Sequence, residues 1–186
     1  MRYIHGPPFT ILSYNVCGVN NHTRHTELRM FLSLMSPSVL ILQEPKVNHL
    51  AGRKPPSFPH YHMLHFKHPS QHTGIVMYIH DSCTFKPLYH VPHCTPYRPD
   101  DTTTAVGWVW VSSDSLPQPI VIGGAYISHA SSEDDIVALA RCTHDASLPI
   151  SCFPAVDVDA LPVFLLGDFN ARHPRWSEED ASAHNS

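Results

Sequence analysis

The chain has 186 residues, of which 42% are hydrophobic and 15% charged, and its formal net charge at pH 7 is −4. A chain of this length can bury a substantial core, so we expect one globular domain over residues 1–186. The acidic balance excludes an overall basic field that would hold nucleic acid by bulk electrostatics, so any such binding has to come from a local patch.

Apolar runs alternate along the chain with amphipathic and proline-rich segments. The runs predict strands at residues 9–14, 38–42, 61–66, 74–80, 105–111, 119–126 and 161–166. We expect the third strand to pair with the fourth and the fifth with the sixth, because each of these pairs is close in the sequence.

Two helices are predicted between these strands. The first spans residues 21–35, with one face formed by Leu28, Phe31, Leu32 and Met35. The second begins at Ser131 or Ser132 and continues to about Cys142, with acidic residues in its first turn as the helix dipole favours. The proline-rich segment 87–101 and residues 147–160 are expected to be irregular.

Polar residues stand where four of the predicted strands end: Asn15, Gln43-Glu44, Tyr126 and Gly167-Asp168-Phe169-Asn170. Gly167 is expected to let the backbone turn. Alternation places Asp168 and Asn170 on one face with Phe169 packed on the other, and it places Glu44 on the face of Leu40 and Leu42.

These residue types carry a definite chemistry. An Asp can orient or supply a proton, and an Asn amide can donate to a phosphate oxygen. A carboxylate on an apolar stripe, as predicted for Glu44, needs a partner such as a cation. Asx turns that close strands are the alternative for Asp168 and Asn170. Four such strand ends favour a site, because ligand sites collect at the carboxyl ends of strands in α/β sheets.

The order and spacing of these motifs resemble the endonuclease/exonuclease/phosphatase superfamily, and the resemblance runs from Phe9 to Trp176. The extension Ala171-Arg172-His173-Pro174-Arg175-Trp176 and the segment 73–79 are most similar to the endonuclease domains of LINE-type retrotransposons. The sequence differs from the superfamily in lacking its terminal Ser-Asp-His-type motif, so we expect a domain that is incomplete at the C-terminus.

The resemblance implies an α/β fold, a DNase I-like four-layered sandwich of two mainly antiparallel sheets flanked by helices, here without the final strands. It also implies hydrolysis of phosphodiesters with a divalent cation, Mg²⁺ or Mn²⁺, and a nucleic acid, DNA, as the partner. The alternatives are a phosphatase of the same superfamily and a catalytically inactive remnant.

The resemblance further implies a role for each motif residue. Glu44 would hold the metal with help from Asn15, and Tyr126 would donate to the phosphate oxygens. Asp168 would orient the attacking water or protonate the leaving oxygen, and Asn170 would grip the phosphate. A basic patch beside the site would bind substrate through Arg172, His173 and Arg175, although solvated loop cations are an equal interpretation.

Other clusters are weaker candidates. His60 and His62 would share a strand face, but no Cys or carboxylate stands near them at zinc-site spacing, so a structural role is favoured over a metal site. Asp157 and Asp159 are expected to be solvated. Five widely spaced cysteines without a Cys-x-x-Cys motif predict neither a disulfide scaffold nor a zinc knuckle.

The first residues of the chain lack the apolar core of a signal peptide, and no run is long enough to span a membrane. We therefore expect an intracellular protein of the nucleus or cytoplasm without a membrane partner.

Overall fold

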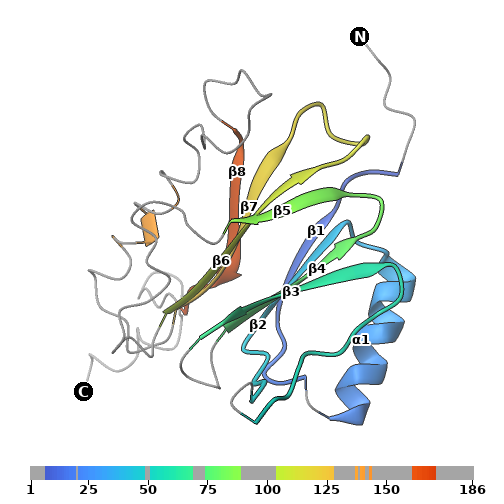
Figure 1. The fold of residues 1–186 in the computed structure, drawn as a ribbon, viewed down its shortest axis with the longest axis vertical. Helices are drawn as coiled ribbons and strands as arrows, with labels where there is room; N and C mark the ends of the chain where they lie inside the picture. The colour runs from blue at the N-terminus through green and yellow to red at the C-terminus, as the bar shows by residue number, and fades with distance from the viewer. Residues whose placement is uncertain are drawn as a thin grey trace, which may run out of the picture.

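Two four-stranded sheets pack face to face, and helix α1 (His22–Met35) covers the outer face of one of them (Figure 1). The first sheet has the order β1-β2-β4-β3, with β1 (Ile11–Asn15), β2 (Val39–Gln43), β3 (Tyr61–Lys67) and β4 (Gly74–His80). The second has the order β5-β6-β7-β8, with β5 (Thr84–Leu88), β6 (Thr104–Ser112), β7 (Ile120–Ile127) and β8 (Val163–Asp168). The computed structural model describes residues 7–19, 21–48, 51–68, 74–88, 104–127, 137, 139, 140, 143 and 161–170.

In each sheet two of the three strand pairings are antiparallel and the third is parallel. The parallel pairs are β1 with β2, where Asn15 lies opposite Gln43, and β7 with β8, where Tyr126 lies opposite Asp168. Parallel neighbours end at the same edge of a sheet, so each sheet carries two carboxyl strand ends to one rim. The predicted α/β sandwich and both predicted hairpin pairings are confirmed.

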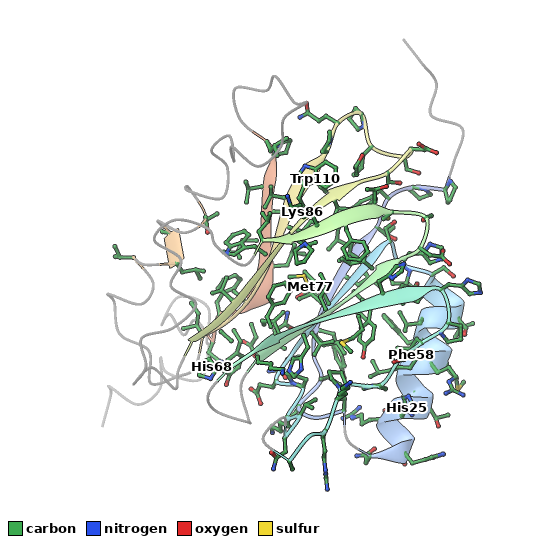
Figure 2. The ribbon with its side chains drawn as sticks, in the orientation of Figure 1. His25, Phe58, His68, Met77, Lys86 and Trp110 are labelled. Atoms are coloured by element: carbon green, nitrogen blue, oxygen red, sulfur yellow. The ribbon has the colours of Figure 1, made fainter. Side chains whose placement is uncertain are left out.

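The central core lies between the two sheets, where Met77 of β4 is seen in Figure 2. Burial of its aliphatic side chains is the main favourable term in forming the sandwich. The core residues include Val39, Ile41, Ile75, Met77, Ile79, Val109, Val111, Ile120 and Ile122. Gly124 of β7 lets the sheets approach, because a Cβ atom there would lie 2.6 Å from Cγ2 of Ile41.

Helix α1 begins where predicted, with Asn21 as the N-cap, whose side chain accepts a hydrogen bond from the Arg24 N–H at 2.7 Å. Leu28 and Leu32 are buried against β2 and β4. Phe31 and Met35 were expected on the same face, but they are 37% and 56% exposed. The buried stripe is therefore narrower than predicted.

Phe31 instead borders an apolar cavity of about 410 Å³ between α1 and β1. On the other side of the helix, the rings of His25 and Phe58 are in contact, with centroids 5.3 Å apart (Figure 2).

Two further expectations concern segments that the structure describes only in part. Residues 137, 139, 140 and 143 are helical, and Leu139 packs with Ala125 and Ile127, while the rest of the predicted second helix lies outside the described residues.

The segment 87–101 was expected to be irregular, but Pro87 and Leu88 belong to β5. This strand lies at a sheet edge, where the missing proline N–H removes little pairing. Residues 89–101 and 147–160, with Asp157 and Asp159, lie outside the described part.

The histidines at the start of β3 lie at the rim opposite the carboxyl ends of β1 and β2. His60 Nδ1 is 3.0 Å from Asp81 Oδ2, and His80 Nδ1 is 3.4 Å from Asp81 Oδ1. The hydrogen bond from His60 is the main cause that lowers the pKa of Asp81. His62 packs its ring against Phe85, with centroids 5.2 Å apart. In the described part of the chain no group of three or more His, Cys, Asp or Glu side chains could hold a metal ion.

None of the helices in the described ranges is both long and apolar enough to cross a bilayer.

Tyr78 supports a first prediction about stability. Its fully buried ring donates a hydrogen bond from the hydroxyl to the Pro56 carbonyl at 2.7 Å, and burial raises the pKa of the phenol. Tyr78→Phe deprives this carbonyl of its donor, so we expect the free energy of unfolding to fall by about 1–2 kcal/mol. Urea denaturation measures the change. The matched control Tyr14→Phe, at a ring that is 47% exposed, should shift stability by less than about 0.5 kcal/mol. Equal effects of the two substitutions would contradict this account.

Candidate active site

Four strands end at one rim of the sandwich, and the predicted site residues meet there. Asn15 ends β1, Glu44 directly follows β2, Tyr126 lies near the end of β7, and Asp168 ends β8. Asn170 lies two residues beyond Asp168. The structure thus brings together all five residues that the motif analysis placed at strand ends, although they come from both sheets.

Asn15 is the bridge between the two sheets at this rim. Its Nδ2 donates to Glu44 Oε1 at 3.2 Å and to Asp168 Oδ2 at 2.7 Å. Its Oδ1 accepts the N–H of Cys17 at 3.0 Å. Both amide hydrogens are therefore used to hold carboxylates, and this geometry favours positioning of Glu44 and Asp168 over direct metal ligation by Asn15.

Glu44 does not continue the face of Leu40 and Leu42, as alternation predicted. Those leucines pack beneath α1, whereas Glu44 contacts Asn15 at the rim between the sheets. The cause is local: Glu44 has a left-handed backbone (φ 48°), which ends the strand alternation one residue earlier than expected. The preceding Gln43 is 1% exposed and donates to Ser13 Oγ at 2.8 Å, which anchors the end of β2.

Gly167 serves close packing within β8, and the predicted turn at this residue is wrong. Gly167 lies opposite Ala125 of β7, and a Cβ atom on it would clash with the Ala125 carbonyl oxygen. The turn follows after Asp168, whose Oδ1 accepts the Asn170 N–H at 3.0 Å. This is the Asx turn that stood as the alternative to a site, and here it helps to build the site. It also leaves Phe169 37% exposed instead of packed.

Asn170 is also tied into the fold. It has a left-handed backbone (φ 43°), and its Nδ2 donates to the Ile127 carbonyl oxygen at 2.7 Å. Ile127 ends β7, so this bond joins the ends of two neighbouring strands. One amide hydrogen that was expected for a phosphate is therefore engaged by the protein.

Tyr126 is a hydrogen-bond donor at neutral pH. Burial is the largest cause that raises the pKa of its phenol to about 12, and the hydrogen bond and charge of Glu44 and the charge of Asp168 act in the same direction. A hydrogen bond with Asn170 lowers the pKa by less. The phenol therefore stays protonated beside two carboxylates. It can donate a hydrogen bond to an oxygen on which negative charge develops.

Lys46 and Cys17 also lie at this site, and neither was predicted from the sequence. Lys46 Nζ is 3.5 Å from Glu44 Oε2 and 2.9 Å from Cys17 Sγ. The hydrogen bond to Cys17 is the main cause that raises the pKa of Lys46, the charges of Cys17 and Glu44 add to it, and burial opposes it. A cation two residues after a strand-end carboxylate was the available signal. Arg172, His173 and Arg175 lie outside the described residues.

The chain belongs to the endonuclease/exonuclease/phosphatase family, whose model matches residues 12–185. This family contains metal-dependent phosphoesterases and nucleases. No curated protein shows a significant match to the sequence.

Several solved structures share the fold. The AP endonuclease LMAP from Leishmania major is 16% identical with a TM-score of 0.58, and the match covers 88% of this chain and 55% of that one. D. rerio TDP2, complexed with single-strand DNA product, is 18% identical with a TM-score of 0.58, covering 89% and 62%. A mannosyl-6-phosphatase from Bacteroides thetaiotaomicron is 13% identical with a TM-score of 0.55, covering 89% and 66%. The chain thus spans little more than half the length of the first of these structures.

The donor set of the site fits a divalent cation of the kind that the family uses. Glu44 and Asp168 present carboxylates from two sheets within reach of one amide nitrogen. Mg²⁺ is commonly held by one or two carboxylates together with waters and substrate phosphate, so a cluster of three protein ligands is not required.

The bridging amide of Asn15 generates a second prediction. Asn15→Asp replaces two donated hydrogen bonds with a third carboxylate, so we expect the free energy of unfolding at pH 7 to fall by about 1–3 kcal/mol. High salt should reduce the loss because it screens the repulsion. Urea denaturation at two ionic strengths tests this.

The matched control for Asn15→Asp is Asn48→Asp. Asn48 Oδ1 accepts the Ala51 N–H at 2.9 Å, and an aspartate retains this acceptor. The control should change stability by less than about 0.5 kcal/mol. A loss of similar size in both variants would show that Asn15 does not hold the carboxylates as described.

Tyr126 generates a third prediction. Its pKa in the folded protein is about 12, against an ordinary value of 10.0. The stability tied to its neutral form is therefore present below pH 10 and is lost as the pH rises towards 12. Alkaline absorbance titrations of wild type and Tyr126→Phe should differ by one phenol. The pKa of that phenol should lie well above the ordinary value of 10.0. If the phenol lost in Tyr126→Phe is instead one that titrates near pH 10, Tyr126 is not protected in the way described.

Proposed function

We propose that this protein hydrolyses phosphodiester bonds with a divalent cation, Mg²⁺ or Mn²⁺, and that DNA is its substrate, as in endonucleases of LINE-type retrotransposons. The observation that carries the proposal is the contact of Asn15 with both Glu44 and Asp168, beside the neutral phenol of Tyr126. Two carboxylates, an amide and a phenol at the ends of four strands form a compact set of acceptors and donors.

The residues divide the chemistry between them. Glu44 would hold the cation, which polarises a phosphate oxygen and offsets the charge that develops on it. Tyr126 would donate its hydroxyl hydrogen to a phosphate oxygen. Asp168 accepts hydrogen bonds on both oxygens, which fix its position, and it would orient an attacking water or protonate the leaving oxygen. Asn15 and Asn170 would keep these groups in register.

Two observations support a nucleic acid as substrate. LMAP is an AP endonuclease and TDP2 was solved with single-strand DNA product, and both share this fold. The segment with Arg172, His173 and Arg175 follows Asn170 in the sequence and would supply local positive charge to a chain whose net charge is −4. An intracellular location, in nucleus or cytoplasm, agrees with such a substrate.

A second candidate is a phosphatase that acts on a small phosphorylated molecule. The net charge of −4 favours it, because a small substrate does not require an extended basic surface. The fold likeness to a mannosyl-6-phosphatase is compatible with this candidate.

Plasmid nicking tests the proposal. Wild-type protein with Mg²⁺ should convert supercoiled plasmid to the open circle. Asp168→Asn should lose about 10²–10⁴-fold in rate, the usual contribution of a positioned acid or base. Glu44→Gln should lose activity as well, because it removes the carboxylate that would hold the cation. Asp114→Asn is the control, because Asp114 is exposed at the opposite end of the β6–β7 pair.

Phosphate release from a small phosphomonoester, measured with the same variants, separates the two candidates. Release without nicking, lost in Asp168→Asn, favours the phosphatase. If the wild type and Asp168→Asn are equally inert in both assays, the chain is an inactive member of its family.

A further inference from the structure

Lys46 places a positive charge directly on the carboxylate that the proposed function assigns to the metal. Its Nζ is 3.5 Å from Glu44 Oε2, while Asn15 occupies Glu44 Oε1. The side chains of Lys46 and Glu44 are 37% and 18% exposed, so the pair lies at the surface of the site, where Lys46 Nζ also donates to Cys17 Sγ at 2.9 Å. A side chain in this place can move without disturbing the core.

The backbone aims the Lys46 side chain at Glu44. Glu44 and Lys46 both have left-handed backbones, with φ 48° and 49°, and Pro45 stands between them. The turn is held from the other side of the site by two hydrogen bonds: the Gly18 N–H donates to the Glu44 carbonyl at 2.8 Å and the Val19 N–H to the Pro45 carbonyl at 3.0 Å. Non-glycine residues in this conformation carry strain that surrounding structure has to offset, and such strain is concentrated at functional positions.

We propose that Lys46 couples the binding of the metal ion to the binding of a phosphate ester at this site. The inference rests on the proposed function. An ammonium and a divalent cation on the same carboxylate repel each other, so Lys46 weakens the binding of a cation to Glu44 for as long as it stays on Oε2. The proposed reaction brings a phosphate group to the site. A phosphate oxygen can accept the hydrogen bond of the Lys46 ammonium in place of Glu44 Oε2.

The coupling works in both directions. A phosphate that draws Lys46 away removes the competitor for Glu44 and strengthens metal binding, and by linkage a bound cation strengthens phosphate binding by the same factor. Without phosphate, Lys46 weakens the binding of the cation. Because the pair is partly exposed, its effect is modest. Lys46 is thus a positioning residue that favours simultaneous occupancy of the site by cation and substrate.

The experiment is a titration of the whole chain with Mn²⁺, followed by electron paramagnetic resonance, with and without a thymidine dinucleotide whose phosphorothioate linkage resists hydrolysis. Lys46→Met keeps most of the unbranched apolar side chain and removes the charge. It should bind Mn²⁺ alone about two- to fivefold more tightly than wild type, the range expected for an exposed ion pair. The dinucleotide should then increase Mn²⁺ affinity less in Lys46→Met than in wild type, by a similar factor. Lys46→Gln should behave in the same way.

Lys54→Met is the charge-matched control, because Lys54 is exposed on the loop between β2 and β3. It should leave both affinities at the wild-type values. The proposal is overturned if Lys46→Met binds Mn²⁺ no more tightly than wild type, if Lys54→Met produces the same gain, or if the dinucleotide acts equally on wild type and Lys46→Met. In each of these cases the proposed function stands. A wild-type chain that binds no Mn²⁺ with or without the dinucleotide overturns the proposed function, and the coupling with it.

Discussion

One side-chain amide joins the two halves of the structure at the site. Asn15 donates to a carboxylate that follows β2 and to another that ends β8, so it satisfies one acceptor from each sheet. A donor that lies between two carboxylates offsets part of their mutual repulsion, as a bound cation would. The rest of the architecture serves this contact: the parallel pairs bring four strand ends to one rim, and Gly124 and Gly167 allow the close approach that aligns them.

Much of this arrangement could be predicted from the sequence. The seven apolar runs are separated by polar or proline-rich segments, and each contributes a strand of the sandwich. The segment 21–35 was predicted as a helix from its apolar face, and α1 spans His22–Met35 with Asn21 as the N-cap. Asn15, Glu44, Tyr126 and Asp168 stood out because each interrupts or ends an apolar run, and a polar residue in that place has to meet a partner at the sheet rim. The family match agrees with the resemblance seen in these motifs.

The remaining features depend on conformations that residue patterns do not encode. The left-handed backbone of Glu44 turns its side chain away from the face of Leu40 and Leu42. The strand alternation assumed for β2 therefore does not extend to this residue. A turn was predicted at Gly167 because the sequence does not show its neighbour Ala125, which is distant in the chain. The backbone of Ala125 leaves no room for a Cβ atom at position 167. Strand β5 was missed because Pro87 argues against a strand unless the strand is known to lie at an edge. Lys46 was overlooked although it stands two residues after a strand-end carboxylate, because its contact with Glu44 depends on the left-handed backbone on both sides of Pro45.

The contact between Asn15 and Asp168 spans 153 positions of the chain. Closing such a long loop costs conformational entropy, and contacts of this kind tend to form late in folding. During synthesis the amide of Asn15 leaves the ribosome long before its partner in β8 exists, while the sheet with β1 and β2 can already assemble. While residues 45–167 are being made, the nascent chain therefore carries Glu44 without Asp168. A site that needs Asn15, Glu44 and Asp168 together is therefore assembled only after β8 has been translated, however early the first sheet forms.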